Sequence, residues 1–325
     1  MERILKFLAC ATTCLAAMPA SAQGTQIATL LSDGEITNYY STSAFTQAYE
    51  NARDGDVITL SSGVFNATDI KKNITVRGSG MGISPDGSYV IPTTLTGQFN
   101  IDLPESDTYR LTLEGLEHNG TINVNNSHDM SVNKCRLGEI YAGLGVKFNA
   151  TFLHCIIGKV SDNGTSSSLT LVNSAVTDEF YMGSSTTHSR QITNCVIYGS
   201  SSASYSLIAN SIYILQKGSA YRTSIDANCT VNNSIIVACG EYKANQGNNS
   251  FLPGVGGVFV DGTNYELTEE FKSFMGTDGT AVGIHGGSLP FTPELDIPRI
   301  SRFNVSPKTT ADGKLSVDIE ITGVE

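Results

Sequence analysis

Short apolar segments recur through the middle of the chain at intervals of about twenty residues. Each has the order apolar residue, any residue, usually Asn, then Cys or Ser, any residue, apolar residue. The Cys or Ser occupies positions 135, 155, 174, 195, 211 and 234, which gives spacings of 20, 19, 21, 16 and 23 residues. A period of this length indicates stacked repeats, each of which buries its apolar face against its neighbours.

Two or three short β-type runs in each period, without a helical period, fit one turn of a right-handed parallel β-helix. Each turn adds about 4.8 Å, the distance between neighbouring strands. Similar runs lie upstream, at residues 57–60, 74–76, 111–113 and 122–124. We therefore predict an all-β, single-stranded right-handed parallel β-helix of roughly nine or ten turns between residues 56 and 250.

Two columns of the repeat have a physical role in such a coil. The column that is usually Asn (Asn173, Asn194, Asn210, Asn233, with His154 in its own turn) suits a tight bend, because Asn tolerates the left-handed backbone conformation. The next column is small and should lie inside the coil. We expect Cys135, Cys155 and Cys195 to be buried packing thiols, since no metal-ligand spacing accompanies them.

The ends of the coil need caps. Residues 43–54 have apolar positions at helical spacing, with Ser43 at the start and Gly55 at the end, and predict an N-terminal helical cap. Near the C-terminus, Leu315, Val317, Ile319 and Ile321 alternate with polar residues. This alternation predicts a half-buried strand, paired with residues 300–305.

The residue after each Cys or Ser should point outward, yet in five turns it is apolar. These five positions, called the outer stripe, are Ile156, Ala175, Val196, Ile212 and Ile235. A sheet that is apolar on both faces is normally covered on both. We therefore expect the outer stripe to be covered by residues 296–325, or by self-association with another subunit.

Residues 1–22 are typical of a secretory signal peptide, with Arg3 and Lys6 before a short apolar core and Ala20-Ser21-Ala22 at its end. A lipid anchor at Cys10 is disfavoured because too little apolar core precedes it. The predicted organisation is a signal peptide (1–22), an N-terminal extension (23–43), the β-helix with its caps (44–295) and a C-terminal strand pair that packs on the helix (296–325). We expect export to the periplasm, the outer surface or the medium, without a transmembrane segment.

Composition narrows the partners. Only 16% of residues are charged and the formal net charge is −11. Removal of residues 1–22 takes away two cations and one anion, a change from −11 to −12. Such an acidic chain is a poor match for nucleic acid. Five cysteines remain after residue 22, so they cannot all pair, and a disulfide between Cys229 and Cys239 stays open.

Two segments resemble known proteins. The predicted cap helix followed by GDVITLSSGVF (55–65) and NITVRGSG (73–80) resembles the opening of the pectin-lyase-like right-handed β-helix superfamily. Residues 278–291 resemble the closing segment of secreted β-helix proteins of Bacteroidetes without an assigned activity. The resemblance implies the fold but no single activity, because the superfamily includes lyases, hydrolases, esterases, adhesins and inert members.

Catalytic signatures of that superfamily are missing. The chain has no Trp, and it lacks the paired Asp residues and the Gly-His-Gly of its hydrolases. Cofactors are not expected, although Ca²⁺ would suit a lyase. The candidate ligand-binding residues are those near predicted loops of successive turns: Tyr141, Asp178, Glu179, Tyr181 and Tyr198. A non-catalytic role in glycan binding or adhesion is the favoured hypothesis; a polysaccharide lyase or glycoside hydrolase and a structural scaffold are the alternatives.

Overall fold

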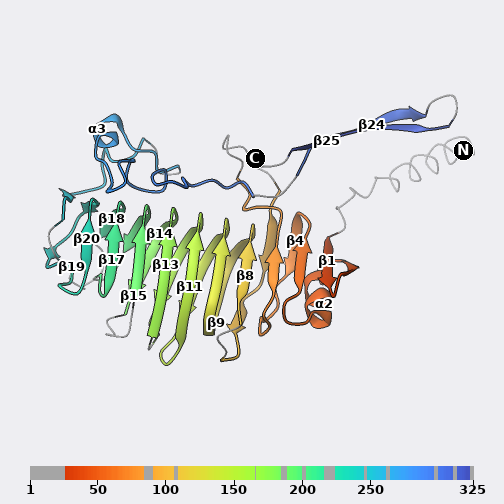
Figure 1. Cartoon of the computed structure of the whole chain (residues 1–325), viewed down its shortest axis with the longest axis horizontal. Coiled ribbons are helices and arrows are strands. Elements are labelled where there is room, and N and C mark those ends of the chain that lie inside the picture. The colour runs from red at the N-terminus through yellow and green to blue at the C-terminus, as the bar shows by residue number, and fades with distance from the viewer. Residues whose placement is uncertain are drawn as a thin grey trace, which may run out of the picture.

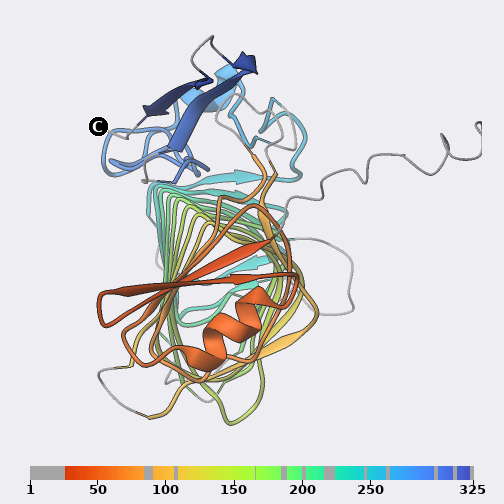
Figure 2. The same cartoon turned by 90° about the vertical axis from the view of Figure 1, so that its right-hand side faces the viewer.

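Parallel strands coil into a β-helix of about eight turns, which confirms the predicted fold class and falls slightly short of nine or ten turns. The computed structural model describes residues 26–83, 91–105, 109–164, 166–183, 189–199, 203–215, 224–244, 247–260, 264–295, 299–309 and 313–322. The coil lies horizontally in Figure 1 and is seen along its axis in Figure 2. The predicted signal peptide lies outside the described residues.

The first long sheet, sheet A, begins with an antiparallel pair and continues as a parallel ladder along the coil. Its strands, in spatial order, are β2 (Glu35–Tyr40), β1 (Ile27–Ser32), β3 (Val57–Leu60), β5 (Thr75–Arg77), β8 (Leu111–Glu114), the second half of β9 (Glu117–Asn133), β11 (Lys147–Leu153), β13 (Ser166–Val172), β15 (Ser189–Thr193), β17 (Ser206–Ala209) and β20 (Thr230–Asn232).

The second long sheet, sheet B, is parallel throughout. It consists of β4 (Gly63–Asn66), β6 (Thr93–Thr96) with β7 (Phe99–Asp102), the first half of β9, β10 (Arg136–Ala142), β12 (Ile156–Asp162), β14 (Ala175–Met182), β16 (Val196–Gly199), β18 (Ile212–Leu215), β21 (Ile235–Val237) and β23 (Ser250–Leu252). A short third pair, β19 (Ser224–Ile225) with β22 (Glu241–Tyr242), lies near the C-terminal end of the coil.

One left-handed residue forms the corner between sheet A and sheet B in each turn of the repeat. The predicted bend residues have positive φ: His154 (53°), Asn173 (44°), Asn194 (53°), Asn210 (53°) and Asn233 (45°). Lys134 has the same conformation, with φ of 52°. The prediction from the Asn column is therefore confirmed, and this set of six is called the corner column.

The small residue after each corner is fully buried, as predicted for Cys135, Cys155 and Cys195. The serines of the same column replace a thiol with a hydroxyl that bonds its neighbours. Ser174 Oγ accepts the amide of Cys155 at 3.0 Å and donates to Val172 O at 2.8 Å. All five described cysteines are free thiols, so Cys229 and Cys239 form no disulfide in this structure.

The N-terminal cap contains the predicted helix and two strands that were not predicted. Helix α2 (Ala44–Asn51) buries Phe45, Ala48 and Tyr49 against the first turn, which confirms the helical spacing. Residues 27–40, part of the predicted N-terminal extension (23–43), form the hairpin β1–β2. Its two-residue turn, Asp33-Gly34, has φ of 51° and 82°. Asp-Gly between two β-type runs is a strong hairpin signal, and it was the signal that sequence reasoning missed.

The outer stripe is covered, but by a different segment from the one expected. Ala175, Val196, Ile212 and Ile235 are fully buried, and Ile156 is partly exposed. The cover is formed by residues 253–295, here called the returning segment, which includes α3 (Glu269–Lys272). Its apolar residues in this cluster are Val258, Tyr265, Leu267, Val282 and Ile284. Among the described residues, the cover of these four positions therefore belongs to the same chain and precedes residue 296.

Side chains of the corner column bind the backbone of the returning segment. Asn233 donates to Met275 O at 3.2 Å, Asn173 donates to Ile284 O and Gly286 O at 2.9 and 2.7 Å, and His154 Nε2 lies 3.0 Å from Leu289 O. At the corner between Asn173 and Asn233, Asn210 Oδ1 accepts a hydrogen bond from the amide of Thr277 at 2.8 Å. The returning segment therefore runs back along the corner, from the last turns toward the first (Figure 1).

The predicted C-terminal strand pair is present as β24 (Arg299–Thr309) and β25 (Leu315–Thr322), which pair antiparallel. The register places Phe303 opposite Ile319 and Val305 opposite Val317. The packing of this pair on the β-helix concerns side chains outside the described ones, so that part stays a prediction.

A buried ion pair lies inside the coil. Arg190 and Asp162 have fully buried side chains whose charged atoms lie 2.7 Å apart. The remaining Arg190 donors reach Ser204 O at 2.9 Å and Gly183 O at 3.0 Å, and Ser167 donates to Asp162 at 2.8 Å. These added hydrogen bonds compensate much of the desolvation that two buried charges require.

Candidate functional site

Two outward-facing columns on sheet B carry three of the five predicted site residues. Strands β10, β12 and β14 align Glu139, Lys159 and Glu179 in one column. The same pairing aligns Tyr141, Ser161 and Tyr181 in the next outward column. Outward positions in a strand alternate with buried ones, here Ile140, Val160 and Phe180. This surface, made of the six outward residues, is called the tyrosine face.

The two tyrosines are two strand spacings apart, which is about 10 Å along the coil. Tyr141 is 40% exposed and Tyr181 is 38% exposed, while Ser161 between them is only 4% exposed. The two exposed rings thus lie on either side of the buried Ser161. Tyrosine offers a large rigid apolar surface together with a polar group, which is the combination that ligands with both C–H faces and hydroxyls require.

A carboxylate–ammonium–carboxylate row borders the tyrosines. Lys159 Nζ lies 3.4 Å from Glu139 Oε1 and 3.6 Å from Glu179 Oε2, and Thr121 donates to Glu139 at 3.1 Å. Partial burial alone would lower the pKa of Lys159, but the charges of Glu179 and Glu139 together raise it above its usual value. Lys159 therefore stays protonated at neutral pH, and it is suited to donating hydrogen bonds rather than to abstracting a proton.

The other two predicted site residues lie apart from the tyrosine face. Tyr198 packs against the apolar cluster beneath the returning segment, and burial raises its pKa. Asp178 influences the same region: burial, with the charges of Tyr198 and Asp178, raises the pKa of Tyr265 to about 12. Tyr198 thus belongs to the cover of the outer stripe and Asp178 is exposed next to Glu179 on β14, whereas Tyr141, Glu179 and Tyr181 share one open surface.

The histidines that could serve as catalytic bases hold the backbone. His154 bonds Leu289 O from the corner column, and His285 Nε2 lies 2.7 Å from Asn264 O. The position of His154 at the corner matches its prediction as a bend residue. Within the described residues, no three His, Cys, Asp or Glu side chains cluster in a way that would hold a metal ion.

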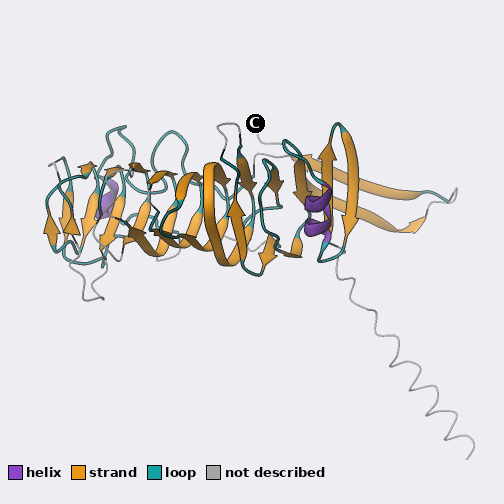
Figure 3. Ribbon diagram, turned by 90° about the horizontal axis from the view of Figure 1, so that it is seen from below, coloured by secondary structure: helices purple, strands orange, loops and turns teal. Residues whose placement is uncertain are grey.

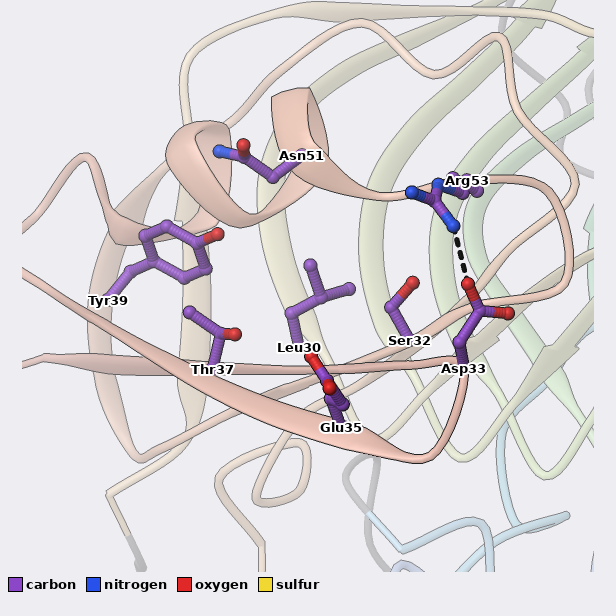
Figure 4. A pocket seen from close by; sticks show the side chains of 8 residues that line it. All are labelled: Leu30, Ser32, Asp33, Glu35, Thr37, Tyr39, Asn51 and Arg53. Carbon is purple, nitrogen blue, oxygen red and sulfur yellow. Dashed lines mark hydrogen bonds and ion pairs between the residues drawn. The ribbon is translucent and has the colours of Figure 1, made fainter.

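An open cleft at the N-terminal cap was not predicted. It has a volume of about 380 Å³ and lies between the β1–β2 hairpin and the end of α2. Figure 4 shows Arg53 paired with Asp33 at one end of the cleft, and Tyr39 and Thr37 at the other. Its lining residues are Leu30, Ser32, Asp33, Glu35, Thr37, Tyr39, Asn51 and Arg53. Among the described lining residues, Arg53 is the one cation, and it is paired with Asp33.

Comparison with known proteins gives no relative: no protein-family model, no curated protein and no solved structure matches the chain. None of the described helices has the length and apolar character needed to cross a membrane. The parallel β-helix architecture and the geometry of the tyrosine face are therefore the grounds on which function is argued.

Proposed function

We propose that the chain is an exported, non-catalytic β-helix protein that binds glycans through the tyrosine face. The supporting observation is the column Tyr141–Ser161–Tyr181, in which two exposed rings flank a sunken residue on a rigid sheet. The faces of sugar rings are rich in C–H groups and pack on aromatic rings, while the charged row of Glu139, Lys159 and Glu179 offers hydrogen bonds to hydroxyls.

The proposal includes membership of the pectin-lyase-like superfamily and a place in the periplasm, on the outer surface or in the medium. The superfamily assignment draws on the resemblance of residues 55–80 and 278–291, together with the observed parallel coil. A rigid sheet suits binding because the side chains of the face are held in place before the ligand arrives, which reduces the entropy lost on association.

The first test measures retention of residues 23–325 on immobilised polysaccharides, with and without Ca²⁺, and assays the same samples for released products. We expect retention without products. Replacing both rings (Tyr141→Ala with Tyr181→Ala) should weaken binding about tenfold or more, because each aromatic contact contributes roughly 0.5–1.5 kcal/mol.

The matched control is Phe251→Ala, which removes an exposed ring from β23 at the far end of sheet B. This variant should bind as the parent chain does. New unsaturated or reducing ends would instead establish a lyase or a hydrolase. Equal loss of binding in Phe251→Ala would show that the tyrosine face is not the site.

A further inference from the structure

The N-terminal end of the coil carries an open sheet edge. Strand β2 pairs with β1, and no other described strand pairs with it. Its outward apolar residues are unusually exposed for their size: Ile36 is 68% and Tyr40 is 57% exposed, next to Leu31 at 43%. Edges of natural sheets are normally protected by Lys, by Pro or by a covering segment. The sequence of β2, Glu-Ile-Thr-Asn-Tyr-Tyr, has a high β-propensity and neither Lys nor Pro.

The opposite end of sheet A is partly covered by a side chain. Asn249 donates to Val231 O of β20 at 2.9 Å and accepts the amide of Ser234, just past the corner, at 3.0 Å. The open edge of β2 is therefore found at the N-terminal end of sheet A and not at its C-terminal end.

The C-terminal hairpin lies at this same end. The returning segment brings the chain back to the first turns, where Leu295 lies against Gly115 so closely that a Cβ on Gly115 would be 2.7 Å from it. Figures 1 and 3 show β24 and β25 continuing past the end formed by β1 and α2. Strand β24 has eleven residues, a length of about 37 Å.

A two-stranded hairpin is at best marginally stable in water and needs a surface to pack on. The register of β24 and β25 alternates apolar pairs, such as Phe303 with Ile319, with polar pairs, such as Asn304 with Asp318. The outer stripe of its own chain is already covered by the returning segment. A hairpin that extends past its own end is placed to meet a surface beyond that end.

We propose that the N-terminal cap is a docking surface for a second copy of this chain, joined end to end through the edges of their β2 strands. A two-fold axis at Asn38 would place Ile36 of each copy opposite Tyr40 of the other and Thr37 opposite Tyr39, so no like charges face each other. Each hairpin then reaches across the junction to the other copy.

The test is the molar mass of residues 23–325 in solution, measured by light scattering after gel filtration over a range of concentrations. We expect a dimer whose mass is halved by the double variant Ile36→Lys with Tyr40→Lys, because two lysines on the edge of each copy would repel each other. Leu144→Lys, an equally drastic change at a more exposed position in the middle of the coil, should leave the dimer intact.

Hydrogen exchange supplies a second measurement. In the parent chain, the β2 amides that point away from β1 should exchange slowly, and in the monomeric double variant they should exchange fast while amides of β11 and β13 stay protected. That pattern separates loss of docking from loss of folding. A monomer at every concentration, or a dimer that survives the double variant, would overturn the proposal. A monomer with slowly exchanging β2 amides would also overturn it, since its own hairpin would then cover the edge.

Discussion

At the scale of single residues, the corner column shows that one required backbone conformation is met by several residue types. All six positions adopt the left-handed conformation, which most L-residues avoid at a cost of about 1–2 kcal/mol and which Asn tolerates. The sequence predicted this from four asparagines. Their second role could not be predicted, because the backbone that their amides bind lies far away in the sequence, 111 residues from Asn173 to Ile284.

Substitution of Asn173 separates the two roles. Asn173→Gly keeps the left-handed backbone and loses the amide, whereas Asn173→Ala loses both. We expect Asn173→Gly to reduce the free energy of unfolding by about 1–3 kcal/mol, since two buried carbonyl groups lose their donor. Asn173→Ala should be less stable by a further 1–2 kcal/mol or so. Urea denaturation followed by circular dichroism measures both values, and equal stabilities of Ala and Gly variants would refute the backbone argument.

The interior thiols predict a dependence of stability on pH. Burial raises the pKa of Cys155 and of Cys195 from its usual value of 9.0 to about 12. Between these two pH values the unfolded chain loses protons that the folded chain keeps, so the free energy of unfolding falls as the pH rises. The loss should be on the order of 1 kcal/mol per pH unit for each thiol.

The sequence itself provides the control for this prediction. Ser replaces Cys in the same interior column at positions 174, 211 and 234, so Cys155→Ser with Cys195→Ser should fold. Denaturation of parent and variant at several pH values between 9 and 12 isolates the thiols from other titrating groups. The variant should lose less stability over this range; parallel curves would show that the thiols do not contribute.

At the scale of elements, the returning segment is the part whose structure was least predictable from the sequence. Its apolar residues follow neither a strand nor a helix period, because most of the segment is irregular and is held by side chains from the corner column. The need for a cover was predicted from the outer stripe. Residues 296–325 were expected to provide it because their alternation predicts a strand pair that needs a surface, whereas among the described residues isolated positions such as Val258, Leu267 and Ile284 cover the stripe.

A single methyl group should detach part of this segment. Gly286 passes so close to the corner column that a Cβ would collide with Ala281 O and lie 2.6 Å from Asn194 Nδ2. We expect Gly286→Ala to lower stability by about 1–3 kcal/mol through strain in a tightly packed region, and to make residues 275–295 accessible to proteases. Limited proteolysis followed by mass spectrometry locates the cuts.

Gly254→Ala is the matched control, because Gly254 belongs to the same segment and a Cβ there would meet no atom within 4 Å. This variant should resist proteolysis as the parent chain does. Increased cutting in both variants would mean that the segment is loosely held regardless of Gly286.

At the scale of the whole molecule, periodic features were predictable and contacts between distant turns were not. The coil, its corners and its interior column follow from a pattern that repeats six times. The tyrosine face depends on position within a turn: Tyr141 follows its small residue by six positions (135 to 141) and Tyr181 by seven (174 to 181), with a bulge that restores the alignment. Tyr198 follows by only three (195 to 198), and it lies elsewhere. This difference in offset can be read from the sequence, and it would have separated Tyr198 from Tyr141 and Tyr181.

The cover of the outer stripe also sets an order of events in time. Both synthesis and export deliver the N-terminal turns first, and each turn can stack as soon as its neighbour is present. Val196, Ile212 and Ile235 then remain in water until residues 258–284 have been made. A chain that ended near residue 250 would form the folded coil with the outer stripe exposed to water. This is the state most prone to aggregation. The residues after 284, about one eighth of the chain, matter little by comparison, so the hazard is confined to one short interval.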